Sequence, residues 1–70
     1  MTITVVGNPS GDWEGVYVDG ILKFEGHSIQ WWQMLKALGI EYTTFDADDE
    51  WLLDRGRLPE KLTEVKKETE

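Results

Sequence analysis

The order of apolar and polar residues divides the chain into short strand-like segments and one clear helical segment. Residues 2–6 alternate threonine with β-branched apolar residues, and residues 40–45 are similar, so both segments are predicted to be strands. Between them, apolar runs flank the dipeptide Asp19-Gly20. This arrangement predicts a hairpin with a type I′ turn, because glycine adopts positive φ freely and aspartate tolerates it.

A two-residue loop at Asp19-Gly20 determines which hairpin residues share a face of the sheet. We expect one face to form the core, and it carries Tyr17, Leu22 and Phe24, extended by Trp13. The opposite face carries an apolar patch near the turn, formed by Val16, Val18 and Ile21. A monomer normally covers such a patch, so these three residues are the predicted surface for self-association.

The helical segment covers residues 29–38, which contain neither glycine nor proline. Ser28 is the predicted N-cap, and Gly39 stands where a left-handed C-terminal cap is expected. At about 100° per residue, Trp31 and Leu35 lie in the middle of the apolar arc. We therefore expect these two side chains to pack against the hairpin.

A second, shorter helix is predicted over residues 49–55, with Asp46 or Asp48 as its N-cap and Gly56 at its end. The predicted fold class is α+β: a small antiparallel sheet of three to four strands with a central hairpin, packed against one amphipathic helix, plus a short C-terminal helix. Residues 1–62 are expected to form a single domain. Residues 63–70 are charged with one lone valine, so we expect a frayed tail.

Composition narrows the function classes. The formal charge is −7, from 14 acidic and 7 basic residues, so nucleic-acid backbones and anionic membranes should repel the chain on average. There is no cysteine, which excludes disulfides and thiolate metal sites and suits a reducing cytosol. No apolar run approaches the roughly 20 residues that a membrane-spanning helix needs.

Motifs for catalysis, metals or cofactors are incomplete. His27 is the only histidine, so imidazoles alone cannot build a metal cluster or a proton relay. Asp46, Asp48 and Glu50 match the first ligand spacing of a calcium loop, but tryptophan replaces the turn glycine and arginine replaces the final glutamate. The glycines of residues 7–12 lack the lysine and spacing of a phosphate loop. We predict no metal, cofactor or catalytic residue, although spacing alone leaves acid–base work by a carboxylate pair open.

Acidic and aromatic residues are the better candidates for binding. The acidic run is either a solvated helix start or a surface that engages a basic partner. Four tryptophans exceed what a core of this size readily hides, and Trp13 on a loop and Trp32 on the helix flank are expected to be partly exposed. The predicted partner-binding residues are therefore Trp13, Trp32, Asp46, Asp48, Asp49, Glu50 and Asp54.

The segment YVDGILKFEGHSI, followed by a helix ending in LKALGIEY, resembles small accessory proteins encoded by tailed bacteriophages. The resemblance covers the middle of the chain, and its hallmarks are a hairpin and a helix cap. It implies a non-enzymatic protein made in the bacterial cytoplasm, of a kind that often resembles inhibitors of host enzymes or host defence. It assigns no binding residues.

Three function hypotheses follow, of which an enzyme is ranked last. The first is a phage-type accessory protein that binds and inhibits a host protein through its acidic and aromatic surface. The alternative is an oligomeric ligand-sequestering protein that traps a nucleotide signal between aromatic side chains, for which the basic candidates are Lys23, Lys36, Arg55 and Arg57. A basic, aromatic pocket would favour the second hypothesis and an acidic face the first.

Overall fold

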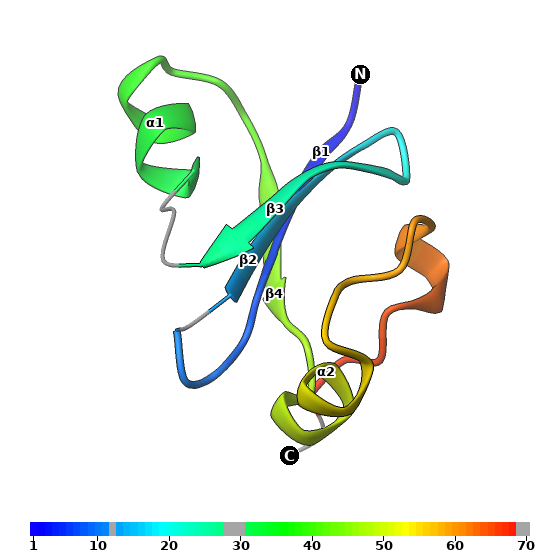
Figure 1. Cartoon of the computed structure of the whole chain (residues 1–70). Helices are drawn as coiled ribbons and strands as arrows, with labels where there is room; N and C mark the ends of the chain where they lie inside the picture. The colour runs from blue at the N-terminus through cyan, green and yellow to red at the C-terminus, as the bar shows by residue number, and fades with distance from the viewer. Residues whose placement is uncertain (12, 28–30, 69–70) are drawn as a thin grey trace.

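The computed structural model describes residues 1–11, 13–27 and 31–68. It has an α+β fold, built on a four-stranded sheet with the strand order β3-β2-β1-β4 (Figure 1). The strands are β1 (Ile3–Gly7), β2 (Trp13–Val18), β3 (Ile21–His27) and β4 (Thr43–Asp46). The helices are α1 (Trp31–Ala37) and α2 (Asp49–Arg55), followed by a 3-10 turn over Leu62–Glu64.

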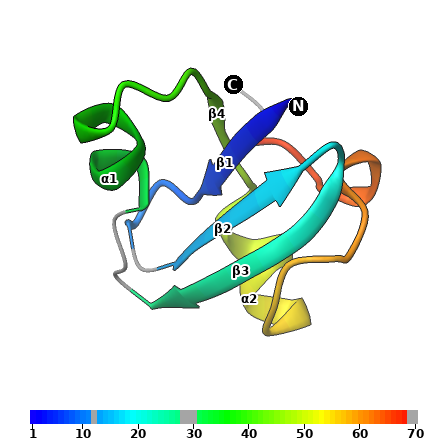
Figure 2. The same cartoon turned by 90° about the horizontal axis from the view of Figure 1, so that it is seen from above.

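The predicted hairpin is present, but it lies at one edge of the sheet. Asp19 and Gly20 both have positive φ, 52° and 84°, as a type I′ turn requires. The hairpin strands β2 and β3 are antiparallel, and β1 is antiparallel to β2. β4 instead runs parallel to β1, so the sheet is mixed and not antiparallel throughout (Figure 2).

The prediction that Phe24 lies in the core is wrong, because the hairpin contains an irregularity. Val18 pairs with Ile21 and Tyr17 with Leu22, as expected, but a register shift between Val16 and Tyr17 then pairs Val16 with Phe24. One extra residue in a strand moves the following side chains to the other face. Phe24 is consequently 60% exposed and leaves the face that carries Tyr17.

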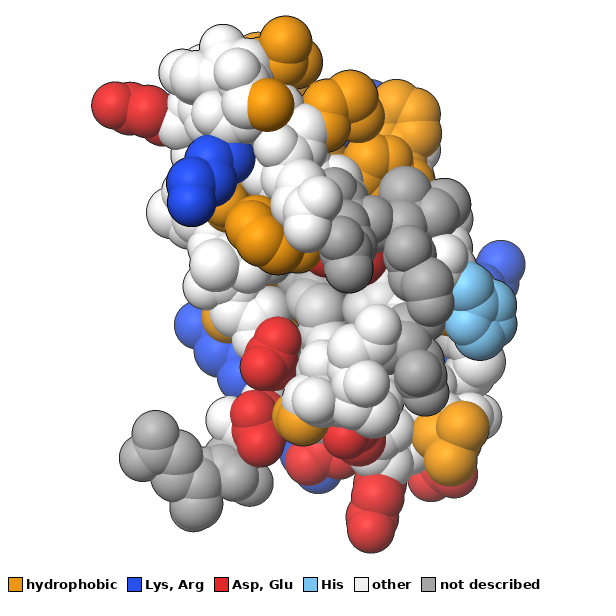
Figure 3. Space-filling view, turned by 90° about the vertical axis from the view of Figure 1, so that its left-hand side faces the viewer, with side chains coloured by type: hydrophobic (Ala, Val, Ile, Leu, Met, Phe, Trp, Pro, Cys, Tyr) orange, Lys and Arg blue, Asp and Glu red, His pale blue; other side chains and the backbone are white. Residues whose placement is uncertain are grey.

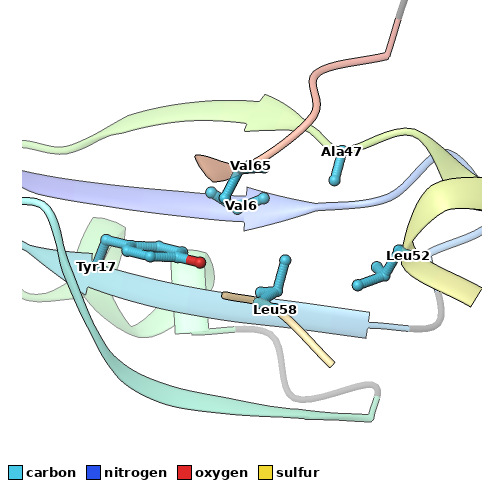
Figure 4. Close-up of a cluster of buried hydrophobic side chains, with 6 residues drawn as sticks. All are labelled: Val6, Tyr17, Ala47, Leu52, Leu58 and Val65. Carbon is cyan, nitrogen blue, oxygen red and sulfur yellow. The ribbon is translucent and has the colours of Figure 1, made fainter. Parts of the chain in front are cut away.

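Each face of the sheet packs against a different layer. The larger core lies between the Tyr17 face and the chain from α2 onward, and Figure 4 shows its buried side chains: Val6, Tyr17, Ala47, Leu52, Leu58 and Val65. Within it, the Tyr17 hydroxyl donates a hydrogen bond to the carbonyl oxygen of Pro59. Burial, together with the charge of Glu25, raises the pKa of this tyrosine far above its ordinary value.

The smaller core lies on the opposite face, beneath α1. Its buried residues Ile3, Val5 and Val16 contact Trp31 and Leu35 of the helix. These two side chains therefore pack against the hairpin as predicted, but on the face that was expected to be the outer one. Figure 1 shows α1 and α2 on opposite sides of the sheet.

The C-terminal cap of α1 agrees with the prediction. Gly39 has a φ of 72°, its N–H donates to Lys36 O at 3.1 Å, and the next N–H, of Ile40, donates to Leu35 O at 3.0 Å. This pair of bonds is the Schellman motif. The predicted N-cap at Ser28 and the helical start at Ile29 lie outside the described residues.

The prediction of a frayed tail is wrong for residues 63–68. Val65 is 9% exposed and belongs to the larger core. Lys66 O accepts a hydrogen bond from Asp48 N at 2.9 Å, and Glu68 N donates to Asp46 O at 2.9 Å. The leucines at positions 58 and 62 also pack on this core, as expected. The chain after α2 is thus part of the folded domain.

In the ranges that the structure describes, no helix is long and apolar enough to cross a membrane.

Candidate partner-binding groove

A groove of about 370 Å³ lies on the α1 side of the sheet, where the helix leaves part of the face uncovered. A helix of seven residues is only about 10 Å long. It packs over Ile3, Val5 and Val16, but not over the ends of β1 and β4. We call this uncovered region the acidic groove, and its lining includes Gly7, Glu14, Trp32, Tyr42, Thr44 and Asp46.

The strand register explains why residues from distant parts of the sequence line this groove. Val5 pairs with Thr44, and Gly7 pairs with Asp46 in the parallel register of β1 and β4. Paired residues point to the same face, and alternate residues along a strand share it. Gly7 and Asp46 therefore lie on the α1 side, beyond the part that the helix covers.

Gly7 keeps the floor of the groove open. A Cβ atom built on this residue would lie 3.4 Å from Asp46 Oδ1 and 3.8 Å from the backbone oxygen of Trp13. Both are ordinary contact distances, so a small side chain would fit there and a large one would extend into the groove.

Glu14 connects the groove to the start of α1. Its Oε1 accepts hydrogen bonds from Trp31 N at 2.6 Å and Trp32 N at 3.4 Å. Partial burial raises the pKa of this carboxyl above its ordinary value, while the two backbone N–H groups oppose the rise. Sequence reasoning did not single out Glu14 as a candidate, although its position in the alternation of β2 placed it on the same face as Val16.

The structure brings three of the predicted binding residues, Trp13, Trp32 and Asp46, into the lining of the groove. Trp32, 37% exposed, and the half-buried Tyr42 provide aromatic surface. Asp46 is exposed and provides a second carboxylate beside Glu14. The groove therefore combines aromatic rings with two acidic groups.

Trp13 borders the groove, but its indole packs on the opposite face of the sheet. The ring packs against the larger core, and Nε1 donates to Glu25 Oε1 at 3.1 Å. Its centroid lies 4.8 Å from that of the exposed His27 in an edge-on arrangement. Trp13 also borders a second groove of about 350 Å³, whose lining includes His27, Asp49 and Leu53.

The remaining acidic candidates divide into structural and exposed residues. Asp48 caps α2, because its Oδ1 accepts from Trp51 N at 3.0 Å. Asp49 accepts from the Ser10 hydroxyl at 3.2 Å. Glu50 and Asp54 are exposed on α2. Figure 3 shows acidic side chains, in red, gathered mainly over the lower part of this side of the molecule, and apolar side chains, in orange, mainly over the upper part.

The apolar patch that was predicted to mediate self-association is mostly covered in the structure. Val16 is only 6% exposed because α1 covers it, and Val18 is half-buried in the same cluster. Ile21 is 37% exposed, and its backbone pairs with Lys61. Other large exposed apolar side chains are Phe24 on β3, Met34 on α1 and Leu38 just after α1.

Within the described part of the chain, no three acidic or histidine side chains lie close enough together to hold a metal ion. Comparison of the chain with models of protein families, with curated proteins and with solved structures gives no significant match.

Proposed function

We propose that this chain is a non-enzymatic binding protein that attaches to a basic surface of another protein and inhibits it. The observation that carries this proposal is the acidic groove, in which Glu14 and Asp46 accompany Trp32 and Tyr42. Among the described residues that line it, none is a lysine or an arginine. Aromatic anchors surrounded by charge of one sign are typical of surfaces that recognise a partner of opposite charge.

The charge of the whole molecule supports the same proposal. The net charge is −7, and Glu50 and Asp54 on α2 add exposed carboxylates to those of the groove. Such a surface attracts basic partners over distances of about one Debye length, roughly 10 Å at moderate salt. The resemblance to phage accessory proteins makes a host protein in the bacterial cytoplasm the proposed partner.

One observation favours the alternative, a protein that sequesters a nucleotide. Arg55 and Arg57 line a separate groove of about 220 Å³. However, Glu25 and Glu60 line the same groove, and the Arg55 guanidinium lies 5.4 Å from the ring of Trp51. Phosphate groups would meet mixed charge there and only carboxylates in the acidic groove, so we rank this function second.

The test is affinity capture from a bacterial lysate, followed by calorimetry with the purified partner at low and high salt. We expect affinity to fall as salt rises. The triple variant Asp46→Asn, Glu50→Gln, Asp54→Asn should bind the partner at least about 3-fold and up to about 100-fold more weakly, since exposed ion pairs contribute about 0.2–1 kcal/mol each. Glu64→Gln, an exposed change outside these grooves, is the matched control and should bind normally. A partner whose affinity responds to neither salt nor the triple variant would contradict the proposal.

A further inference from the structure

We propose that the acidic groove receives one arginine side chain of the partner, with the guanidinium between Glu14 and Asp46 and against the aromatic surface of Trp32 and Tyr42. This inference rests on the proposed function and specifies the chemistry that the groove recognises.

The size of the groove suits a single side chain. Its volume of about 370 Å³ is at the lower end of the range for small-molecule sites, about 300–1,000 Å³. The groove is therefore too small for a helix or a folded segment of a partner.

The lining has the two features that bind a guanidinium. Carboxylates accept its N–H donors in a planar, often bidentate, arrangement. Aromatic faces attract the cation through their quadrupole, with tryptophan the strongest. A phosphate or carboxylate ligand would instead be repelled, since the described lining supplies two acidic groups and no basic one.

Glu14 is also held in place before any ligand arrives. Its Oε1 is fixed by the N–H groups of Trp31 and Trp32, so the side chain loses little rotamer freedom on binding. Trp31 and Trp32 begin α1, so these bonds hold the carboxylate at the start of the helix that carries the Trp32 indole.

The test uses the full chain, labelled with ¹⁵N, and follows its backbone and indole resonances by NMR during titration with N-acetyl-arginine amide. N-acetyl-citrulline amide has nearly the same shape without the charge, and AMP represents the nucleotide class. We expect the arginine probe to shift the Trp32 indole resonance and the amides of Gly7, Thr44 and Asp46. Citrulline should bind at least about threefold more weakly, because it lacks the positive charge that makes the cation–π contact and the ion pairs.

Two kinds of variant locate the site. Glu14→Gln and Asp46→Asn remove charge while keeping oxygen acceptors, and each should weaken the arginine probe about 2- to 5-fold. Gly7→Leu fills the floor of the groove and should abolish the shifts at Trp32. Thr63→Leu adds comparable bulk at an exposed position and should leave the titration unchanged.

The proposal is overturned if citrulline binds as well as arginine, if AMP causes the same shifts more strongly, or if Gly7→Leu binds arginine normally. None of these three outcomes decides whether the proposed binding function is correct. A captured partner that binds Gly7→Leu with full affinity would leave the binding function standing and remove the arginine site. Specific arginine binding without any salt-sensitive partner would support the arginine site and contradict the proposed function.

Discussion

Glycine is required at position 15 and useful at position 7 for different structural reasons. Gly15 lies in the buried part of β2, where a Cβ atom would overlap Leu58 Cδ1 and lie 3.2 Å from Leu22 Cδ1. Gly7 lies at the end of β1, where the nearest atom to a Cβ would be 3.4 Å away. The first glycine allows the segment after α2 to approach the sheet closely, and the second keeps a groove open.

We predict that Gly15→Ala lowers the free energy of unfolding by about 1–3 kcal/mol, because the added methyl group overpacks a core that cannot expand without moving Leu58. Gly7→Ala is the matched control. It should change stability by less than about 1 kcal/mol, with a gain expected from the reduced freedom of the unfolded chain. Urea denaturation of both variants measures the difference. Equal losses in the two variants would show that the close approach of Leu58 is not what Gly15 permits.

Glu14 gives a pH-dependent prediction. Burial raises the pKa of its carboxyl above the ordinary value of 4.5, against the opposing effect of the Trp31 and Trp32 N–H groups. A raised pKa in the folded state means that the contribution of this group to stability is fully present below the ordinary value and is lost as pH rises through the folded value. In Glu14→Gln the group stays neutral, and its amide oxygen still accepts the hydrogen bonds.

We therefore expect the stability of the parent protein relative to Glu14→Gln to fall between about pH 4 and about pH 7. Urea titrations of both proteins at the two pH values measure the change, and the other carboxyls cancel in the difference. A difference that stays constant, or that moves in favour of the parent at the higher pH, would contradict the assigned effect of burial.

The two helices show how far local sequence determines an element. α2 spans Asp49–Arg55, as predicted, because its cap at Asp48 and its terminator Gly56 are both local signals: Asp48 accepts from Trp51 N, and Gly56 has a φ of 78°. The glycine cap of α1 is equally local. The face on which α1 packs is not, because both faces of the hairpin carry apolar residues and the helix rests on Ile3 and Val5 of the neighbouring strand as well as on Val16.

For the N-cap of α2, we predict that Asp48→Ala lowers the free energy of unfolding by about 1 kcal/mol, within the range of about 0.5–2 kcal/mol for lost N-caps. Asp54→Ala removes the same charge from an exposed position of the same helix and should have a smaller effect. Thermal denaturation followed by circular dichroism compares the two. If Asp54→Ala is as destabilising as Asp48→Ala, the loss reflects charge and not the hydrogen bond to Trp51.

Over the whole molecule, the sequence predicted the hairpin, both helices and the fold class, because each has a signal within a few residues. It did not predict the parallel pairing of β1 with β4, which joins segments far apart in the chain. The groove follows from that pairing, since Gly7 and Asp46 meet only in the folded sheet. Trp32 and Asp46 were identified as candidates one at a time, without any means of showing that they lie together.

Val65 was missed for a related reason: a single apolar residue among charged neighbours has no periodic pattern. In the structure it fills the larger core, and the backbone after it bonds to the ends of β4 and α2 through Asp46 and Asp48. Removal of residues 63–70 should therefore destabilise the protein. Burial of a valine contributes about 1.5–3 kcal/mol and each backbone hydrogen bond about 0.5–1.5 kcal/mol.

A domain of this size has only a few kcal/mol of stability, so we expect the truncated chain to melt at least about 10 °C lower or to lose its cooperative transition. Val65→Ala should give a smaller decrease in the melting temperature, because it keeps the backbone hydrogen bonds. Calorimetry of the two variants separates these contributions. An unchanged melting temperature in the truncated chain would mean that the segment is a tail after all, and that Val6 and Tyr17 form a stable core without it.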